Sequence, residues 1–120
     1  MEIQDAKLRA AAWTGAGIQT NPAINTILAD TGALGAAGDD GHEYDFLVVI
    51  SSSAAADVSI EHRNAANTAN VETATHVVPA SLVAIFVQAR MARNERLRVI
   101  MAAALTGRIS ATIHRVRAHD

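Results

Sequence analysis

Apolar and polar residues alternate along much of the second half of the chain, from residue 57 to residue 117. Val58, Ile60 and His62 fall on one side of an extended segment, and the residues between them fall on the other. The same spacing returns near the end of the chain, in Ile109, Ala111 and Ile113. A period of two is typical of antiparallel strands with one face on a core and one in water. The pattern therefore predicts an all-β domain.

Further strand-like segments occur at near-regular intervals and are separated by turn residues. The expected strands are residues 24–28, 44–51, 57–63, 71–78, 82–87, 97–101 and 108–116. Residues 44–51 are apolar on both faces and are expected to form a central strand. The Asn-rich segment 64–70 predicts a turn, and Pro79 ends the strand before it. Together these features predict an antiparallel β-sandwich or jelly-roll-like domain of seven or eight short strands.

A helix is the alternative for residues 81–105. This segment is rich in Ala, Leu, Met and Arg, which are good helix formers, and it contains no Gly or Pro. Strands are the preferred interpretation because Val83, Ile85 and Val87 are β-branched and alternate, and because Asn94 interrupts the segment.

Residues 1–22 differ from the rest and are expected to form an extended N-terminal arm, with the sandwich domain at 23–120. Lys7 to Ala12 have the composition of a short helical turn, but the glycines and Asn21-Pro22 that follow stop a regular element. Trp13 is the only tryptophan. It either plugs one end of the sandwich or anchors the arm on a neighbouring subunit.

Composition predicts a thin core. Half of the residues are apolar, but 26 of the 120 are alanine and only 3% are aromatic, so little surface is buried per residue. A thin core favours oligomerisation. There is no cysteine, no apolar run of membrane-spanning length and no signal-peptide pattern at the start.

Charge is unevenly distributed although the net charge is only −2. Residues 30–61 carry seven acids and no Lys or Arg, whereas residues 88–120 carry seven arginines against Glu95 and Asp120. The asymmetry indicates either surfaces for self-association and docking or ordinary solvated faces. Nucleic-acid binding is disfavoured because the chain is net acidic and has few aromatics to stack on bases.

Candidate chemical sites are weak. The five histidines lack the spacing of a zinc site, although His62 and His76 flank one turn and could face each other across a strand pair. The acids Asp39, Asp40, Glu43 and Asp45 lie in what looks like a Gly-rich loop without the EF-hand pattern. No phosphate loop or nucleophile elbow is present. We therefore expect no enzyme activity, metal or cofactor.

Several short segments resemble the capsid decoration, or cement, proteins of tailed bacteriophages. The similarity spans about residues 13–116 and rests on four segments: 28–34 (LADTGAL), 58–66 (VSIEHRNAA), 94–99 (NERLRV) and 104–107 (ALTG). One departure is residues 89–93, which are basic and alanine-rich where that group often has a strongly apolar strand.

The resemblance implies a virion protein on the capsid surface that clamps neighbouring major capsid subunits, commonly as a homotrimer. The residues we expect to contact partners are in the arm and the arginine-rich segment: Trp13, Ile18, Arg90, Arg93 and Arg96. An alternative is a tail or baseplate sandwich that binds a receptor or glycan. A small sandwich-fold enzyme or metal-binding protein is the third hypothesis. No nucleic acid or membrane partner is expected.

Overall fold

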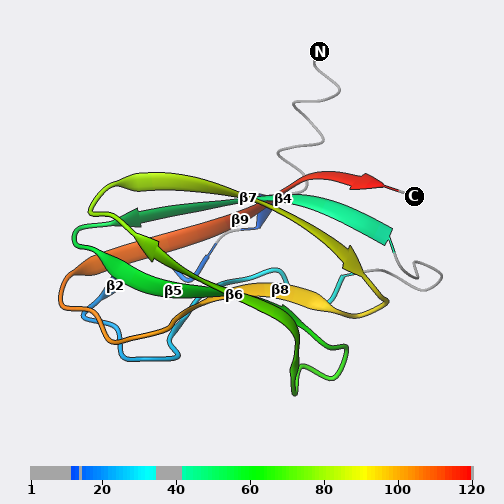
Figure 1. Cartoon of the computed structure of the whole chain (residues 1–120), viewed down its shortest axis with the longest axis horizontal. Helices are drawn as coiled ribbons and strands as arrows, with labels where there is room; N and C mark the ends of the chain where they lie inside the picture. Colours follow the sequence, from blue (N-terminus) through cyan, green and yellow to red (C-terminus); the bar gives the residue numbers. More distant parts are fainter. Residues whose placement is uncertain (1–11, 14, 35–41, 120) are drawn as a thin grey trace, which may run out of the picture.

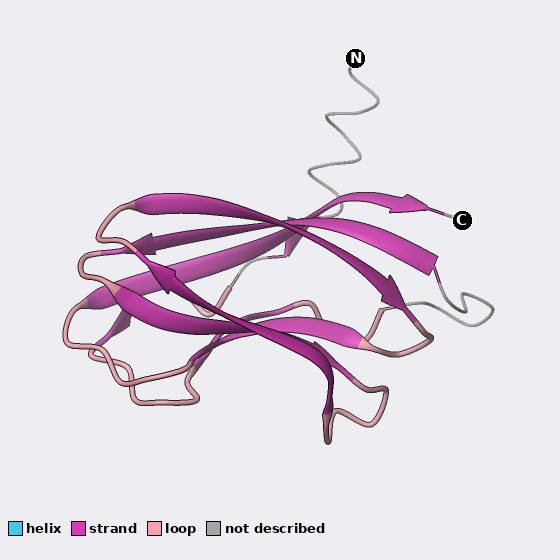
Figure 2. Cartoon of the chain, viewed as in Figure 1, coloured by secondary structure: helices cyan, strands magenta, loops and turns pink. Residues whose placement is uncertain are grey.

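Two antiparallel sheets make up the computed structural model, which describes residues 12–13, 15–34 and 42–119 (Figures 1 and 2). The first sheet contains β1 (Ala12–Trp13), β2 (Gln19–Thr20), β4 (His42–Ser52), β7 (Leu82–Met91) and β9 (Arg108–His119). The second contains β3 (Ile27–Asp30), β5 (Ala56–Arg63), β6 (Asn70–Val78) and β8 (Arg96–Met101). The predicted all-β sandwich is confirmed.

The strand order places one free edge of each sheet on the same side of the molecule. In the first sheet β9 and β4 are central and β7 is the edge; in the second the order is β3-β8-β5-β6. Residues 79–81 connect the two edge strands β6 and β7. Figure 1 shows the sheets as an upper layer (β4, β7, β9) and a lower layer (β5, β6, β8).

β4 is central, as its sequence predicted. It pairs with β7 on one side and with β9 on the other. Phe46, Val48 and Ile50 point into the sandwich and are fully buried. The alternate residues Leu47 and Val49 are half-buried on the outer face.

Residues 81–105 form strands, so the helix alternative is wrong. β7 and β8 span most of the segment, and a turn at residues 92–95 separates them. Val83, Ile85 and Val87 pack against the core cluster on one face of β7. Their period of two outweighed the helix propensity of the surrounding alanines and arginines.

The described part of the predicted arm is joined to the domain. β1 and β2 pair one after the other with β9, so residues 12–13 and 19–20 extend the first sheet. Between them the amide N–H of Ala16 donates to the carbonyl of Leu28 at 2.9 Å. The helical turn expected at Lys7 to Ala12 lies almost entirely outside the described residues.

β5 and β6 do not show the alternation of buried and exposed side chains that is expected of a half-buried strand. Val58, Ile60 and His62 point inward as predicted, but Ser59 and Glu61 on the outer side are also buried, with relative exposures of 8% and 7%. β6 shows the opposite behaviour, because residues 70–75 are exposed on both faces. The alternation of apolar and polar residues identified β5 and β6 correctly as strands. It did not predict which of their side chains are exposed to solvent.

Candidate interaction site

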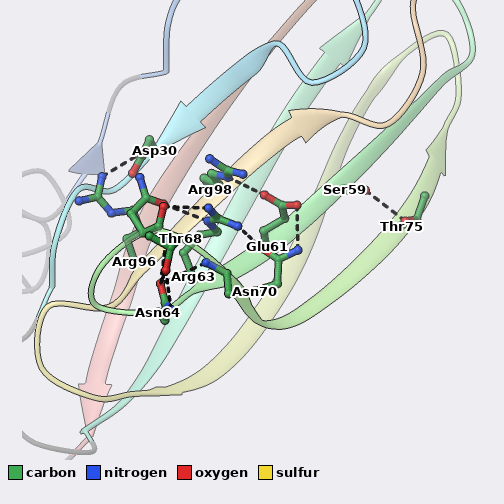
Figure 3. Close-up of polar contacts among 12 residues, drawn as sticks. Asp30, Ser59, Glu61, Arg63, Asn64, Thr68, Asn70, Thr75, Arg96 and Arg98 are labelled. Carbon is green, nitrogen blue, oxygen red and sulfur yellow. Dashed lines mark hydrogen bonds and ion pairs between the residues drawn. The ribbon is translucent and has the colours of Figure 1, made fainter.

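A polar network covers the outer face of the second sheet next to β6 (Figure 3). Arg98 Nε on β8 donates to Glu61 Oε1 at 2.5 Å, and Asn70 Nδ2 donates to Glu61 Oε2 at 3.0 Å. Arg96 Nη1 forms an ion pair with Asp30 Oδ2 at 3.4 Å. These contacts explain the burial of Glu61, which lies between its partners on the neighbouring strands.

The same network fixes the turn between β5 and β6. Arg63 donates through Nε to Asn67 Oδ1 and through Nη1 to Asn70 Oδ1, both at 2.9 Å. Asn64 Oδ1 accepts the amide N–H of Thr68 at 2.8 Å. Asn67 has a φ of 57°, a left-handed conformation that Asn tolerates better than most residues. The predicted Asn-rich turn is confirmed, and it sets where β6 begins.

A histidine–carboxylate contact lies on the inner side of the same end of β5. His62 Nε2 lies 2.8 Å from Glu95 Oε1, and the amide N–H of Ala92 donates to the same oxygen at 2.7 Å. His62 is opposite Glu72 in the strand register, and His76 is opposite Val58. The two histidines therefore do not face each other across the strand pair. Among the described residues, no group of three or more His, Asp or Glu could hold a metal ion.

The side of the sandwich formed by β6 and β7 is uncovered in the described part of the chain. On β6, Val77 is 74% exposed and Val71 is 55% exposed. On β7, Leu82 is 69% exposed and Phe86 is 60% exposed. Leu47 on β4 lies directly opposite Phe86, so Leu47, Leu82 and Phe86 form an apolar patch on the outer face of the first sheet. We call the free sides of β6 and β7, together with this patch, the open edge.

A pocket of about 130 Å³ opens between the sheets along this edge. Its polar lining comes mainly from His62, Glu72 and His76 of the second sheet and from Gln88 of β7. Apolar residues line the remainder: Ile60, Ala74, Val87, Ala89 and Leu97. The pocket exists because β7 and β6 are the last strands of their sheets and no further strand among the described residues closes the gap.

The residues expected to contact partners do not form one site. Trp13 is paired through its backbone with Ile113, and its side chain lies outside the described residues. Ile18 is 72% exposed beside residues 51–53, at one end of β4. Arg90 is exposed at the opposite end of β4, across from Glu43.

The other two predicted residues flank the turn between β7 and β8. Arg93 is exposed in the turn itself, whereas Arg96 is half-buried and held by Asp30. Arg90 and Arg93 thus lie near one end of the open edge, and Arg96 belongs to the polar network instead.

The predicted acidic loop is only partly described. Asp39 and Asp40 lie outside the described residues. Glu43 and Asp45 are strand residues on β4, so the loop interpretation is wrong for both; for Asp45 the strand expected at residues 44–51 is confirmed. Asp45 is buried, and its Oδ1 accepts a hydrogen bond from Gln88 Nε2 at 2.9 Å.

Sequence reasoning missed the open edge, although a signal for it was present. Residues 73–89 contain no Asp, Glu, Lys or Arg, and this stretch covers most of both edge strands. Edge strands in soluble proteins are usually protected by charged residues, internal prolines or bulges. A long uncharged stretch that spans two strands is therefore a signal of unprotected strand edges.

Comparison with known proteins supports the fold. No protein-family model matches the chain, and no curated protein matches it by sequence. The chain is similar to a solved structure described as "BiXyn10A CBM1 APO", a carbohydrate-binding module, with a TM-score of 0.57 and 7% sequence identity. The match covers 95% of this chain and 84% of the other. At this identity the similarity shows the β-sandwich fold alone. The described residues contain no helix long and apolar enough to cross a membrane.

Proposed function

We propose that the chain is a non-enzymatic structural protein that binds the exterior of an assembled phage capsid and clamps neighbouring major capsid subunits. The open edge is the observation that carries this proposal. It combines two edge strands that carry only one Asp, Glu, Lys or Arg residue each, Glu72 on β6 and Arg90 on β7, with an exposed apolar patch. Such surfaces mark protein–protein contacts. The sequence resemblance to capsid decoration proteins names the kind of partner.

The composition of the open edge matches that of a protein interface. Phe86 is a large aromatic side chain, 60% exposed, with Leu47 opposite it and Leu82 on the same face of β7. Buried aromatic anchors surrounded by a polar rim dominate interface energies. Arg90 and Arg93 supply charge at one end of the patch, where they would fix orientation on an acidic partner surface.

A repeating lattice makes modest contacts sufficient. Each copy of the protein needs only a small interface when many neighbouring sites are presented at high effective concentration.

The test uses phage heads assembled without this protein and the purified chain of residues 1–120. We expect the chain to bind the heads and to raise the temperature at which they release DNA. Phe86→Glu should weaken binding at least tenfold, because the carboxylate would be desolvated at the centre of the patch. Ile24→Glu is the matched control, since Ile24 is 56% exposed but lies before β3, on the opposite edge of the second sheet. Lack of binding by the wild-type chain, or binding without a gain in head stability, would contradict the proposal.

Glycan binding by a tail or baseplate module is the second candidate, and the pocket is the observation that favours it. Glu72 and His76 offer hydrogen-bonding groups beside apolar residues, and the similar solved structure is a carbohydrate-binding module. The residues described along the pocket include no Phe, Tyr or Trp side chain to stack on a sugar ring. Calorimetric titration with soluble polysaccharides separates the two candidates, because saturable binding that His76→Ala abolishes would favour the glycan module.

A further inference from the structure

β6 is a long, unprotected edge strand. Among the described residues it pairs only with β5, and its other side is free. Its nine residues contain one charged group, Glu72, and no Lys, Arg or Pro. A free edge of this kind is a template for pairing with another strand.

The sequence of β6 is complementary to itself when two copies run antiparallel with Ala74 opposite Ala74. In that register Val71 is opposite Val77, and Thr73 is opposite Thr75. Glu72 is opposite His76, so that each carboxylate meets an imidazole that can donate a hydrogen bond. Aliphatic pairs, threonine pairs and acid–base pairs are the cross-strand combinations that stabilise sheets. Because the pairing is symmetric, each of these contacts occurs twice.

Other symmetric arrangements are poorer. Moving the centre to Thr75 places Glu72 opposite Val78 and Thr73 opposite Val77, and so mixes polar with apolar side chains. The corresponding pairing of β7 about Phe86 places Leu82 opposite Arg90. Ala74 is also the midpoint of β6, which spans residues 70–78, so this register uses the full length of the strand.

The polar side chains that the pairing would engage, Glu72 and His76, have no polar partner within the described part of the chain. Neither Glu72 nor His76 forms a hydrogen bond or ion pair with another described residue, although the strand around them is well bonded to β5. Both side chains point toward the space between the sheets, beside the pocket at the open edge.

We propose that β6 pairs antiparallel with β6 of a second copy of this chain across a two-fold axis at Ala74. The two four-stranded sheets then join into one continuous sheet. The proposal does not depend on capsid binding. It differs from the homotrimer implied by the sequence resemblance, because a three-fold axis cannot pair a strand antiparallel with the same strand of another copy.

A disulfide trap tests the register. The chain has no cysteine, so Ala74→Cys introduces a single thiol. Directly opposite residues have Cα atoms about 4.5–5.5 Å apart, which a disulfide can bridge. Thr75→Cys is the matched control, because its two thiols would sit on diagonal neighbours about 7–8 Å apart, beyond easy bridging. We expect Ala74→Cys to form a covalent dimer under mild oxidation at least tenfold faster than Thr75→Cys.

The mass of the wild-type chain in solution is the second measurement. Light scattering after size-exclusion chromatography should give twice the 12.6 kDa of one chain at micromolar concentration. A monomer or a trimer at all concentrations would overturn the proposal. Equal cross-linking rates for the two cysteine variants would also overturn it. They would show that the thiols of two copies react by random collision and not in a fixed strand register.

Discussion

Glu61 shows how much a single residue depends on contacts that alternation does not reveal. The sequence placed Glu61 on the polar side of its strand, and the structure confirms the side but not the solvent exposure. Its partner Arg98 is 37 positions away in the sequence, so no local pattern could have predicted the pair. The burial of Glu61 follows from which strands are neighbours, and that information is absent from any one strand.

The network around Glu61 predicts a large stability effect. Glu61→Ala leaves the guanidinium of Arg98 without its carboxylate in a half-buried position, and removing one partner of such a buried pair costs about 3–5 kcal/mol. We expect the free energy of unfolding, measured with urea, to fall by about 3 kcal/mol. Asp57→Ala is the control because Asp57 is exposed on the same face of β5, and its effect should stay within about 0.5 kcal/mol. Similar losses for both variants would show that the network adds little.

At the scale of elements, the sequence predicted the strands that carry the core, but it did not predict which strands lie at the edges of the two sheets. The apolar run at residues 44–51 identified β4 as a strand, and β4 does lie between β7 and β9. Its outer face, with Leu47 and Val49, is only half-buried, so the apolar residues on this face do not reflect coverage by a further layer among the described residues. The alternation of Val83, Ile85 and Val87 identified β7 as a strand. Neither pattern shows which strand is an edge, because strand order is set by non-local pairing. The open edge and its pocket follow from that order.

The junction between the arm and the domain gives the prediction at this scale. Gly15 lies between β1 and β2, and a Cβ there would come within 1.8 Å of the carbonyl oxygen of Ala111 and 2.5 Å of that of Leu28. Both contacts are with backbone, so relief requires the segment to move away from β9. We expect Gly15→Ala to lower the free energy of unfolding by about 1–3 kcal/mol, measured by thermal denaturation. Ala16→Ser, at the exposed neighbouring position, should have little effect. An unchanged melting temperature for Gly15→Ala would show that residues 12–20 are not held against β9.

At the scale of the whole molecule, the two proposals use different parts of the open edge: the free side of β6 pairs with a second copy, and the patch around Phe86 contacts the capsid. The two-fold axis of the dimer relates the two copies of this patch. The two-fold axis that relates two paired antiparallel strands is perpendicular to their sheet. Rotation about this axis leaves each face of the sheet pointing in the same direction in both copies. The apolar patches around Phe86, on the outer face of the first sheet, would then both point in one direction. A dimer of this form presents two equivalent contacts to a single partner surface.

This arrangement predicts that dimerisation strengthens capsid binding. Ala74→Lys places two ammonium groups directly opposite each other at the axis and adds the charge that protects natural edge strands. Because Ala74 is exposed and lies on the other sheet from the patch, the variant should fold, become monomeric and keep its Phe86 surface. Loss of the second contact should weaken its binding to phage heads by about a hundredfold or more, measured by co-sedimentation over a concentration series. Thr73→Ser, on the same strand, should remain dimeric and bind like the wild-type chain. If monomeric Ala74→Lys bound as tightly as the dimer, the two patches would not act together, and each copy would hold the capsid through a single contact.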